Sequence, residues 1–443
     1  MKRTTVTCAL LAVSMIGLTA CGGSKPEASP QGGPNDAGKP NSAEIMNRHV
    51  ELNVFSNSGD TDEGFNDKFG DAIRKKFPNY TINYIKRPKN GNVEELLSSG
   101  TKIDLIWDTI GYFPDTVMRY NLQYDLTDAV KTHQIDLNRF EPTLMDGIKN
   151  MSASGLYGLP VQTQNLVLFY NKDIFDKFGV PYPKDGMTWD EAIALGKKVT
   201  RSDGGVDFLG LAASVQHVAR MSQFSLPVID PQTQKPTYND EKWKLLFQKL
   251  YVDPAQQEQY KNWYLAHKAN ENPFQNEFVK DRNLAMFAFL SSFYTSRDLE
   301  SMNWDMVTLP TFQEQPGVGS QHYPVYFSIA SISQHKEEAL EVIKYLISDE
   351  YQTAASKQGF MTVLKNDKIR DLTGQESKVK GKNIKSMFAL KPAPIPAKTI
   401  YDLRIDAVYT RAISDVVLGK KNINDYLRET QEMTEKKLAE LKK

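Results

Sequence analysis

The chain has 443 residues, and its 54 lysines and arginines are balanced by 54 aspartates and glutamates, so its formal net charge is zero. A neutral chain lacks the basic excess that nucleic acid or an extended anionic membrane face attracts, which excludes both as partners. The 395 residues after position 48 are too many for one compact core and suit two α/β lobes.

Residues 1–20 have the pattern of an export signal. Lys2 and Arg3 precede an apolar run from Val6 to Gly17 that is too short to span a bilayer. The following Leu18-Thr19-Ala20-Cys21 resembles a bacterial lipobox, in which the cysteine is acylated and becomes the first residue of the mature protein. A plain signal peptide with a chance cysteine is the alternative. The only other cysteine, Cys8, lies in the signal, so no thiol is left for a disulfide, a metal or a nucleophile.

Residues 21–48 are rich in Gly, Pro, Ser and Asn, and we expect them to form a disordered tether. A flexible linker over residues 22–48 has a root-mean-square reach of about 28 Å. We therefore expect a protein on the extracellular face of the cell membrane, attached to the membrane only through its lipid.

The globular part opens with alternating strands and helices. Strands are predicted at 50–55, 80–87 and 102–109, with helices at 63–77 and 92–100 between them. This alternation predicts a mostly parallel sheet, and in open α/β sheets ligands bind at the carboxyl ends of the strands. The first candidate site residues follow these ends: Asn57, Ser58, Asp60, Asp108, Thr109 and Tyr112.

Other conspicuous segments are interpreted as structure. Thr188 and Glu191 have the spacing of a capping box, which places Trp189 in the core. Residues 337–347 carry one apolar stripe and are predicted to be a covering helix. Residues 424–443 are predicted to be an amphipathic docking helix rather than a coiled coil for a partner.

The segment from Gly155 onward resembles the family 1 extracellular solute-binding proteins, the group that includes maltose-binding protein. The resembling pieces are Tyr157-Gly158-Leu159-Pro160, Tyr170-Asn171-Lys172, Gly179-Val180-Pro181, Thr188-Trp189-Asp190-Glu191, and the blocks 278–293 and 306–333. The resemblance extends over nearly all of residues 50–443, and it rests on the order and spacing of these pieces rather than on any single motif.

This resemblance implies a type II periplasmic-binding-protein-like fold, with two α/β lobes joined by hinge crossovers. The first lobe would comprise 49–161 with 327–368, and the second 162–326 with 369–443. The solute would bind between the lobes of a monomer, and the closed form would be recognised by the membrane subunits of an ATP-driven (ABC) importer.

The resemblance also implies further site residues. Gln162, Thr163 and Gln164 would form a crossover strand and a cleft wall. Ser291, Ser292 and Phe293 follow the Ala285-Met286 pair, where relatives place a ligand-facing loop, although Asp281-Arg282-Asn283 and Ser291-Ser292 depart from the usual residues. Tyr323 and Tyr326 lie in the expected second hinge, where either could brace the hinge or contact the ligand.

The polar and aromatic candidates favour a sugar, since sugars combine hydroxyl groups with apolar faces that stack on rings. An anion would require cations, and His217 with Arg220 is the only nearby pair. A peptide or polyamine ligand, or a sensor or adhesin on the same fold, are further alternatives.

We predict no enzyme. The sequence has no Gly-x-Ser-x-Gly, His-Glu-x-x-His, Walker or Gly-x-Gly-x-x-Gly motif, and no cofactor or metal site is predicted. Ser99 and Lys102 match Ser-x-x-Lys without its companion motifs, and Asp60-x-Asp62-x-Gly64 lacks most ligands of a calcium loop. A pair of carboxylates for glycan cleavage is the least favoured alternative.

Overall fold

The structure, a computed structural model, describes residues 41–88, 93–152, 155–411 and 413–443. Residues 42–443 form one compact unit. The predicted signal, Cys21 and most of the predicted tether lie outside the described residues. The first element, α1 (Ser42–Met46), falls inside the predicted tether, but Ile45 is buried and Arg48 pairs with Glu338 at 2.7 Å. The folded part therefore begins at residue 42 rather than at 49.

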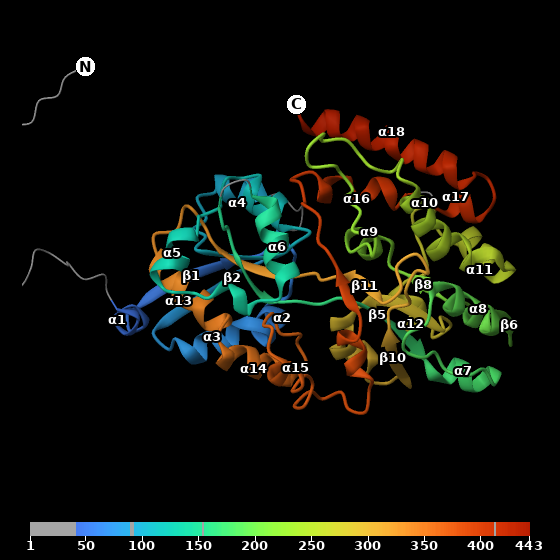
Figure 1. Cartoon of the computed structure of the whole chain (residues 1–443), viewed down its shortest axis with the longest axis horizontal. Helices are drawn as coiled ribbons and strands as arrows, with labels where there is room; N and C mark the ends of the chain where they lie inside the picture. Colours follow the sequence, from blue (N-terminus) through green and yellow to red (C-terminus); the bar gives the residue numbers. More distant parts are fainter. Residues whose placement is uncertain (1–40, 89–92, 153–154, 412) are drawn as a thin grey trace, which may run out of the picture. The chain divides into compact units, whose positions relative to one another are not determined.

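Two sheets form the centres of two lobes (Figure 1). The first sheet has the strand order β2-β1-β3-β12-β4, and the second has the order β10-β5-β9-β8. The first comprises β1 (Val50–Phe55), β2 (Tyr80–Ile85), β3 (Leu105–Thr109), β4 (Leu159–Gln162) and β12 (Val325–Ile329); the second comprises β5 (Leu166–Asn171), β8 (Ala212–Ala213), β9 (Met286–Leu290) and β10 (Trp304–Thr308). The two-lobe α/β prediction is confirmed.

One strand in each sheet runs against the others. In the first sheet β12 is antiparallel to both β3 and β4, whereas β1 is parallel to β2 and β3. In the second sheet β5 is antiparallel to both β9 and β10, whereas β8 is parallel to β9. The reversed strands are the two that enter their sheets directly from the hinge. Each sheet is therefore mostly parallel, as predicted.

The first three strands and their helices match the sequence pattern closely. The predicted helix at 63–77 is a continuous run in which one wider turn, η1, joins two α-helical pieces. Phe65, Phe69, Ile73 and Phe77, spaced four residues apart, are all buried. The helical elements of the first lobe are α2 (Asp62–Phe65), η1 (Asn66–Gly70), α3 (Asp71–Lys76), α4 (Val93–Ser98), η2 (Pro114–Met118), α5 (Thr127–Thr132), η3 (Leu137–Arg139), α6 (Pro142–Met151), α13 (Lys336–Leu346), α14 (Asp349–Gln358) and α15 (Asp367–Arg370).

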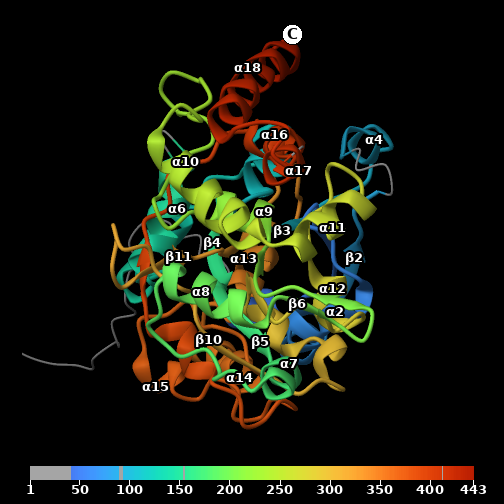
Figure 2. The ribbon, with the colours of Figure 1, turned by 90° about the vertical axis from the view of Figure 1, so that its right-hand side faces the viewer.

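The second lobe contains more helices. They are α7 (Lys172–Phe178), α8 (Trp189–Val199), α9 (Val215–Arg220), α10 (Glu241–Phe247), η4 (Gln248–Val252), η5 (Pro254–Gln256), α11 (Glu258–Ala266), α12 (Gln275–Val279), η6 (Ser291–Thr295), η7 (Arg297–Leu299), η8 (Ile384–Phe388), α16 (Asp402–Tyr409), α17 (Ile413–Val417) and α18 (Ile423–Leu441). A hairpin of β6 (Arg201–Asp203) and β7 (Val206–Phe208) lies outside the main sheet. In Figure 2 α16, α17 and α18 lie at the same end as α10.

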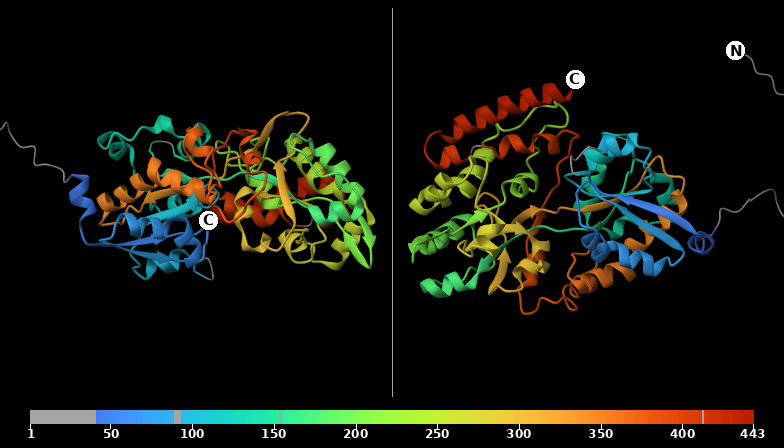
Figure 3. Two further views of the ribbon diagram at one scale, coloured as in Figure 1. Left: turned by 90° about the horizontal axis from the view of Figure 1, so that it is seen from below. Right: turned by 180° about the vertical axis from the view of Figure 1, so that it is seen from behind.

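Three further expectations about structural segments are confirmed. Thr188 and Glu191 form the capping box of α8, and the buried Trp189 donates its indole hydrogen to Gln223 at 2.9 Å. The covering helix is α13. The terminal helix α18 packs on α10 and α16, so it docks within its own chain, and Figure 3 shows it along the second lobe.

Two extended segments form the hinge. Residues 163–165 lead from β4 into β5, and residues 322–324 lead from β11 (Val318–Gln321) into β12. The segments are hydrogen-bonded to each other, because the amide of Tyr323 donates to the carbonyl of Gln164 at 2.7 Å. β11 also pairs in parallel with β13 (Lys391–Ala393), from which the chain continues to α16.

Candidate functional site

A cavity of about 1060 Å³, which we call the main cavity, has walls from both lobes. Its first-lobe wall contains Asn57 and Tyr112, which follow β1 and β3. The carboxyl ends of these strands therefore face the second lobe, as the parallel sheet predicted. The side chain of Asn57 is buried, and its Oδ1 has no hydrogen-bond partner among the described residues. A buried amide oxygen without a partner can accept a hydrogen bond from a ligand.

Two of the arginines that line the main cavity are paired with carboxylates of the same lining. Arg220 of α9 forms an ion pair with Asp406 of α16, and its guanidinium lies 5.6 Å from the ring centre of Tyr112 in the first lobe. Arg404 contacts Asp115 at 2.7 Å. Because each of these cations has a carboxylate partner, neither is left as a free charge for an anionic ligand.

Aromatic side chains on the second-lobe wall complete the main cavity. Trp263 stacks on His267 with a ring separation of 3.8 Å, and its indole donates to Glu277 at 3.2 Å. Phe274 also lines the cavity and is 38% exposed. The amide of Phe274 donates to the same carboxylate, that of Glu277, at 2.7 Å. The cavity thus combines amide and hydroxyl groups with ring surfaces.

Seven of the predicted site residues come together in a second, smaller cavity of about 180 Å³. They are Ser58, Asp60, Thr109, Gln162, Thr163, Gln164 and Ser292. Ser292 donates to Gln164, and Asp60 pairs with Lys68 at 2.6 Å. Trp107 also lines this cavity, and its buried indole N–H has no hydrogen-bond partner among the described residues.

Asp108 lies beneath the site rather than in it. Its side chain is 0% exposed, and Oδ1 accepts hydrogen bonds from the amide of Ser58 at 2.7 Å and from the hydroxyl of Ser56 at 3.1 Å. Burial raises the pKa of Asp108 from 3.8 to about 6. The carboxyl group holds the loop that carries Asn57 and Ser58, so a role in positioning replaces the direct contact that we expected.

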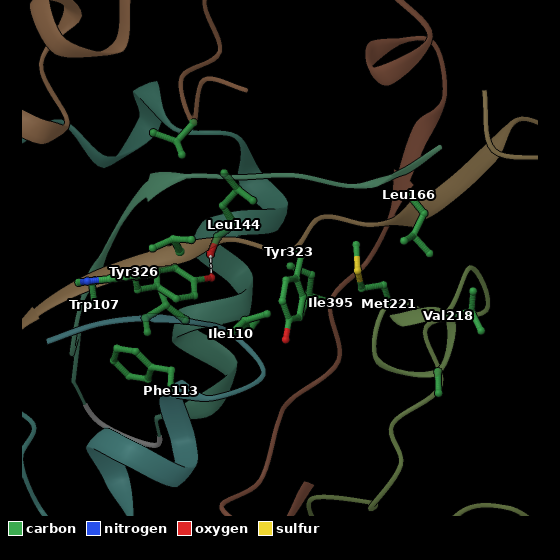
Figure 4. Close-up of a cluster of buried hydrophobic side chains, with 14 of the residues drawn as sticks. Trp107, Ile110, Phe113, Leu144, Leu166, Val218, Met221, Tyr323, Tyr326 and Ile395 are labelled. Carbon is green, nitrogen blue, oxygen red and sulfur yellow. Dashed lines mark hydrogen bonds between the residues drawn. The ribbon is translucent and has the colours of Figure 1, made fainter. Parts of the chain in front are cut away.

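Four other candidates are buried away from both cavities. Tyr326 lies in the first-lobe core and donates to the carbonyl of Leu144 at 2.6 Å (Figure 4). Phe293 packs against Phe169 and Phe289, and the hydroxyl of Ser291 accepts from the amide of Asn165 at 3.2 Å. These three side chains brace the lobes and the hinge.

Tyr323, the fourth, contacts the site indirectly. Its hydroxyl lies 3.4 Å from Nη1 of Arg220, and a β-carbon added at Gly111 would come within 2.2 Å of it. In Figure 4 its ring extends away from Tyr326. Tyr323 therefore links the hinge to an arginine of the main cavity.

Sequence reasoning missed most of the second-lobe wall. Trp263, His267, Phe274 and Asp406 were not candidates, and Arg220 was considered only for an anionic ligand. One signal was available: residues 262–276 contain four asparagines beside three aromatic residues and a histidine in a polar stretch. Asp406 could not be found in this way, because it lies more than a hundred residues along the chain from the segment 262–276.

The described residues show neither a metal-ligand cluster nor a membrane-spanning helix. They include no cluster of three or more histidine, cysteine or acidic side chains that could hold a metal ion. Within the same ranges no helix has the length and apolar character needed to cross a membrane.

Residues 56–353 match the bacterial extracellular solute-binding protein family. The chain belongs to this family. Its function is therefore solute binding, not catalysis, as the sequence predicted. No curated protein matches the chain.

Solved structures of other solute-binding proteins share the fold of this family member. An ABC substrate-binding protein from Listeria monocytogenes, in complex with cycloalternan, aligns with a TM-score of 0.68 at 17% identity, covering 88% of this chain and 100% of the other. A sugar transporter protein from Rhizobium etli in an open conformation gives 0.62 at 20% identity, with 86% and 98% covered. Maltose-bound MalE3 of T. maritima gives 0.63 at 14% identity, with 88% and 100% covered.

The position of Asp108 generates a prediction about pH. Since its pKa is raised in the folded state, the unfolded chain releases the proton near pH 3.8 while the folded chain holds it to about pH 6. Between these values the contribution of Asp108 to stability falls as the pH rises, by up to about 3 kcal/mol. Asp108→Asn keeps the acceptor for Ser58 and should remove this loss.

Urea unfolding of the wild type and of Asp108→Asn at several pH values measures the effect. Relative to the wild type, the free energy of unfolding of the variant should increase from pH 4 to pH 6. Above pH 6 the difference between the two free energies should stay constant. If the difference between the two free energies of unfolding does not change from pH 4 upward, the carboxyl group of Asp108 is ionised in the folded protein over that whole range.

Proposed function

We propose that this protein captures a neutral sugar or oligosaccharide between its lobes for an ATP-driven importer. The observation that carries the proposal is the lining of the main cavity, in which amide and hydroxyl groups lie beside aromatic rings while Arg220 and Arg404 are paired with carboxylates. Hydroxyl-rich, uncharged ligands with apolar ring faces match such a surface.

An anionic solute is less consistent with these contacts. Arg220 already pairs with Asp406, and burial lowers the pKa of His217 to about 3, so this histidine is uncharged at neutral pH. His217 instead contacts the hydroxyl of Ser214 at 2.6 Å through Nδ1. The pair that the sequence offered for an anion therefore has other partners.

The ligands of structurally similar proteins agree with a carbohydrate. The Listeria monocytogenes protein was solved with cycloalternan and the T. maritima protein with maltose. At 17% and 14% identity these similarities establish the fold only. The sugar assignment therefore depends on the chemistry of the cavity, and the ligands of the two similar proteins are consistent with it.

The proposed mechanism of capture depends on the fact that the main cavity has one wall on each lobe. A solute that contacts Asn57 and Tyr112 on one lobe and Trp263 and Phe274 on the other stabilises the state in which the lobes are close together. A shift from 1:99 to 99:1 requires about 5.5 kcal/mol of differential binding free energy. A few hydrogen bonds and one stacked ring supply this amount. The smaller cavity, with Gln162 and Gln164, extends the proposed site to the hinge.

The proposal includes the location and organisation of the protein. Cys21 would carry the lipid that anchors a monomer to the extracellular face of the membrane, after a signal at 1–20. The lobes would comprise residues 42–161 with 327–370, and 162–326 with 371–443, because the boundary between 368 and 369 that the resemblance implied falls within α15. The closed form would dock on the membrane subunits of the importer.

A thermal-shift screen of residues 42–443 against mono- and oligosaccharides tests the solute class, with amino acids, peptides, polyamines and anions as controls. A ligand at one hundred times its Kd should stabilise the fold by about 2.7 kcal/mol, which raises the Tm by a few degrees. A response to sugars alone is expected. A response only to anions, peptides or polyamines would overturn the sugar assignment and retain solute capture, and no response at all would favour a sensor or adhesin.

Phe274→Ala tests the main cavity with the sugar that the screen identifies. Loss of one stacking surface should weaken binding by about tenfold, measured by isothermal titration calorimetry. Leu265→Ala is the matched control, because Leu265 is 69% exposed and does not line the cavity. Equal affinities for the two variants would place the sugar elsewhere.

Cys21→Ser in the full chain tests the anchor. The variant should move from the membrane fraction to the soluble fraction of the producing cells, because it cannot be acylated. Immunoblots of the two fractions measure this change. Unchanged membrane association would contradict lipid anchoring through Cys21.

A further inference from the structure

A second large cavity, of about 710 Å³, lies against the hinge, and we call it the hinge cavity. One wall belongs to the first lobe, in the segment from Met361 to Arg370 that follows α14. The other wall belongs to the second lobe, in η8 and β13, and includes Met387, Phe388 and Leu390. His322 and Thr163 of the two hinge segments also line the cavity.

The hinge cavity opens on the opposite face of the hinge from the main cavity. Consecutive side chains of an extended segment point to opposite faces. Tyr323 reaches Arg220 of the main cavity, at 3.4 Å, whereas the neighbouring His322 lines the hinge cavity and contacts the hydroxyl of Thr143 at 3.2 Å. The two cavities are therefore separate sites.

Each wall contributes adaptable apolar side chains to a lining that also contains polar groups. Met361 and Met387 are buried in the facing walls, and Leu364, Phe388 and Leu390 extend the same surface. Thioether side chains adjust readily to the shape of an apolar ligand. The guanidinium of Arg370 lies 5.9 Å from the ring centre of Phe388, so a cation of one lobe approaches an aromatic ring of the other.

Cations outnumber carboxylates around this cavity. The lining includes three cations, Lys365, Lys368 and Arg370, and two carboxylates, Glu141 and Asp367, so its formal charge is +1. Arg370 pairs with Asp367 at 2.8 Å, and the two lysines are exposed side chains. Lys365 and Lys368 therefore supply positive charge at the margin of a cavity that has apolar side chains on both walls.

A buried polar group at the hinge lines both the hinge cavity and the smaller cavity. Thr163 is 3% exposed, and its hydroxyl has no hydrogen-bond partner among the described residues. Buried hydroxyl groups are normally hydrogen-bonded, so this one is available to a bound molecule.

We propose that the hinge cavity binds an amphipathic organic anion, such as a medium-chain carboxylate or an aryl sulfonate. The apolar body of the anion packs between the methionine-containing walls, and its acidic group lies at Lys365 and Lys368. The site is distinct from the main cavity and does not depend on the identity of the captured solute.

A titration of residues 42–443 with the fluorescent anion 8-anilinonaphthalene-1-sulfonate tests the proposal, with decanoate as competitor. We expect saturable one-to-one binding that decanoate displaces. Phe388→Ala and Lys368→Glu should each weaken it by about tenfold. Lys436→Glu is the matched control, since Lys436 is an exposed residue of α18 outside the cavity, and it should leave the affinity unchanged.

Each alternative outcome is informative. No saturable binding by the wild type, or equal affinities for the wild type, Phe388→Ala and Lys368→Glu, would overturn the proposal. Loss of binding in Phe274→Ala alone would place the anion in the main cavity instead. Thermal unfolding checks that each variant is folded, and Lys365→Glu repeats the charge test if Lys368→Glu is unstable.

Discussion

The hydrogen-bonded hinge is the constraint on which the rest of the structure depends. The amide of Tyr323 binds the carbonyl of Gln164, and both segments continue directly into a sheet. A strand that enters from the hinge must run away from it, which is why β12 and β5 are the reversed strands. The remaining strands of each sheet then end toward the other lobe. The loops that follow β1 and β3 thus face the second lobe because of how the chain crosses between the lobes.

Charge compensation gives the main cavity its chemical character. Asp115 is buried and accepts from both Arg119 and Arg404 at 2.7 Å, and Arg220 pairs with Asp406. Arg404 and Asp406 both come from α16, so the C-terminal segment supplies one partner of two of these three pairs. A buried charge without a partner is costly, whereas these pairs place polar surface in the cavity at little net charge. At these two ion pairs the cavity offers directional hydrogen bonds rather than free charge.

The sequence predicted the parts of the site that follow a strand. Asn57 and Tyr112 could be placed because periodicity locates strand ends, and strand ends locate the cleft, whereas Gln162 was placed by the family resemblance. The sequence could not separate a residue that lines a cavity from one that supports it. Asp108 and Tyr326 are polar residues in the right segments, yet both are 0% exposed and hydrogen-bond to the backbone of their own lobe. Asp406 required knowledge of how α16 packs, which no local pattern contains.

The alternation of side chains at the hinge limits how this protein can change in evolution. Tyr323 and His322 are neighbours that serve opposite faces. Inserting or deleting a single residue between β11 and β12 would exchange the two faces, since it shifts the alternation by one. It would turn an imidazole toward the main cavity and a phenol toward the rear. Surface loops of this fold can vary in length, but the hinge segments can vary only in composition.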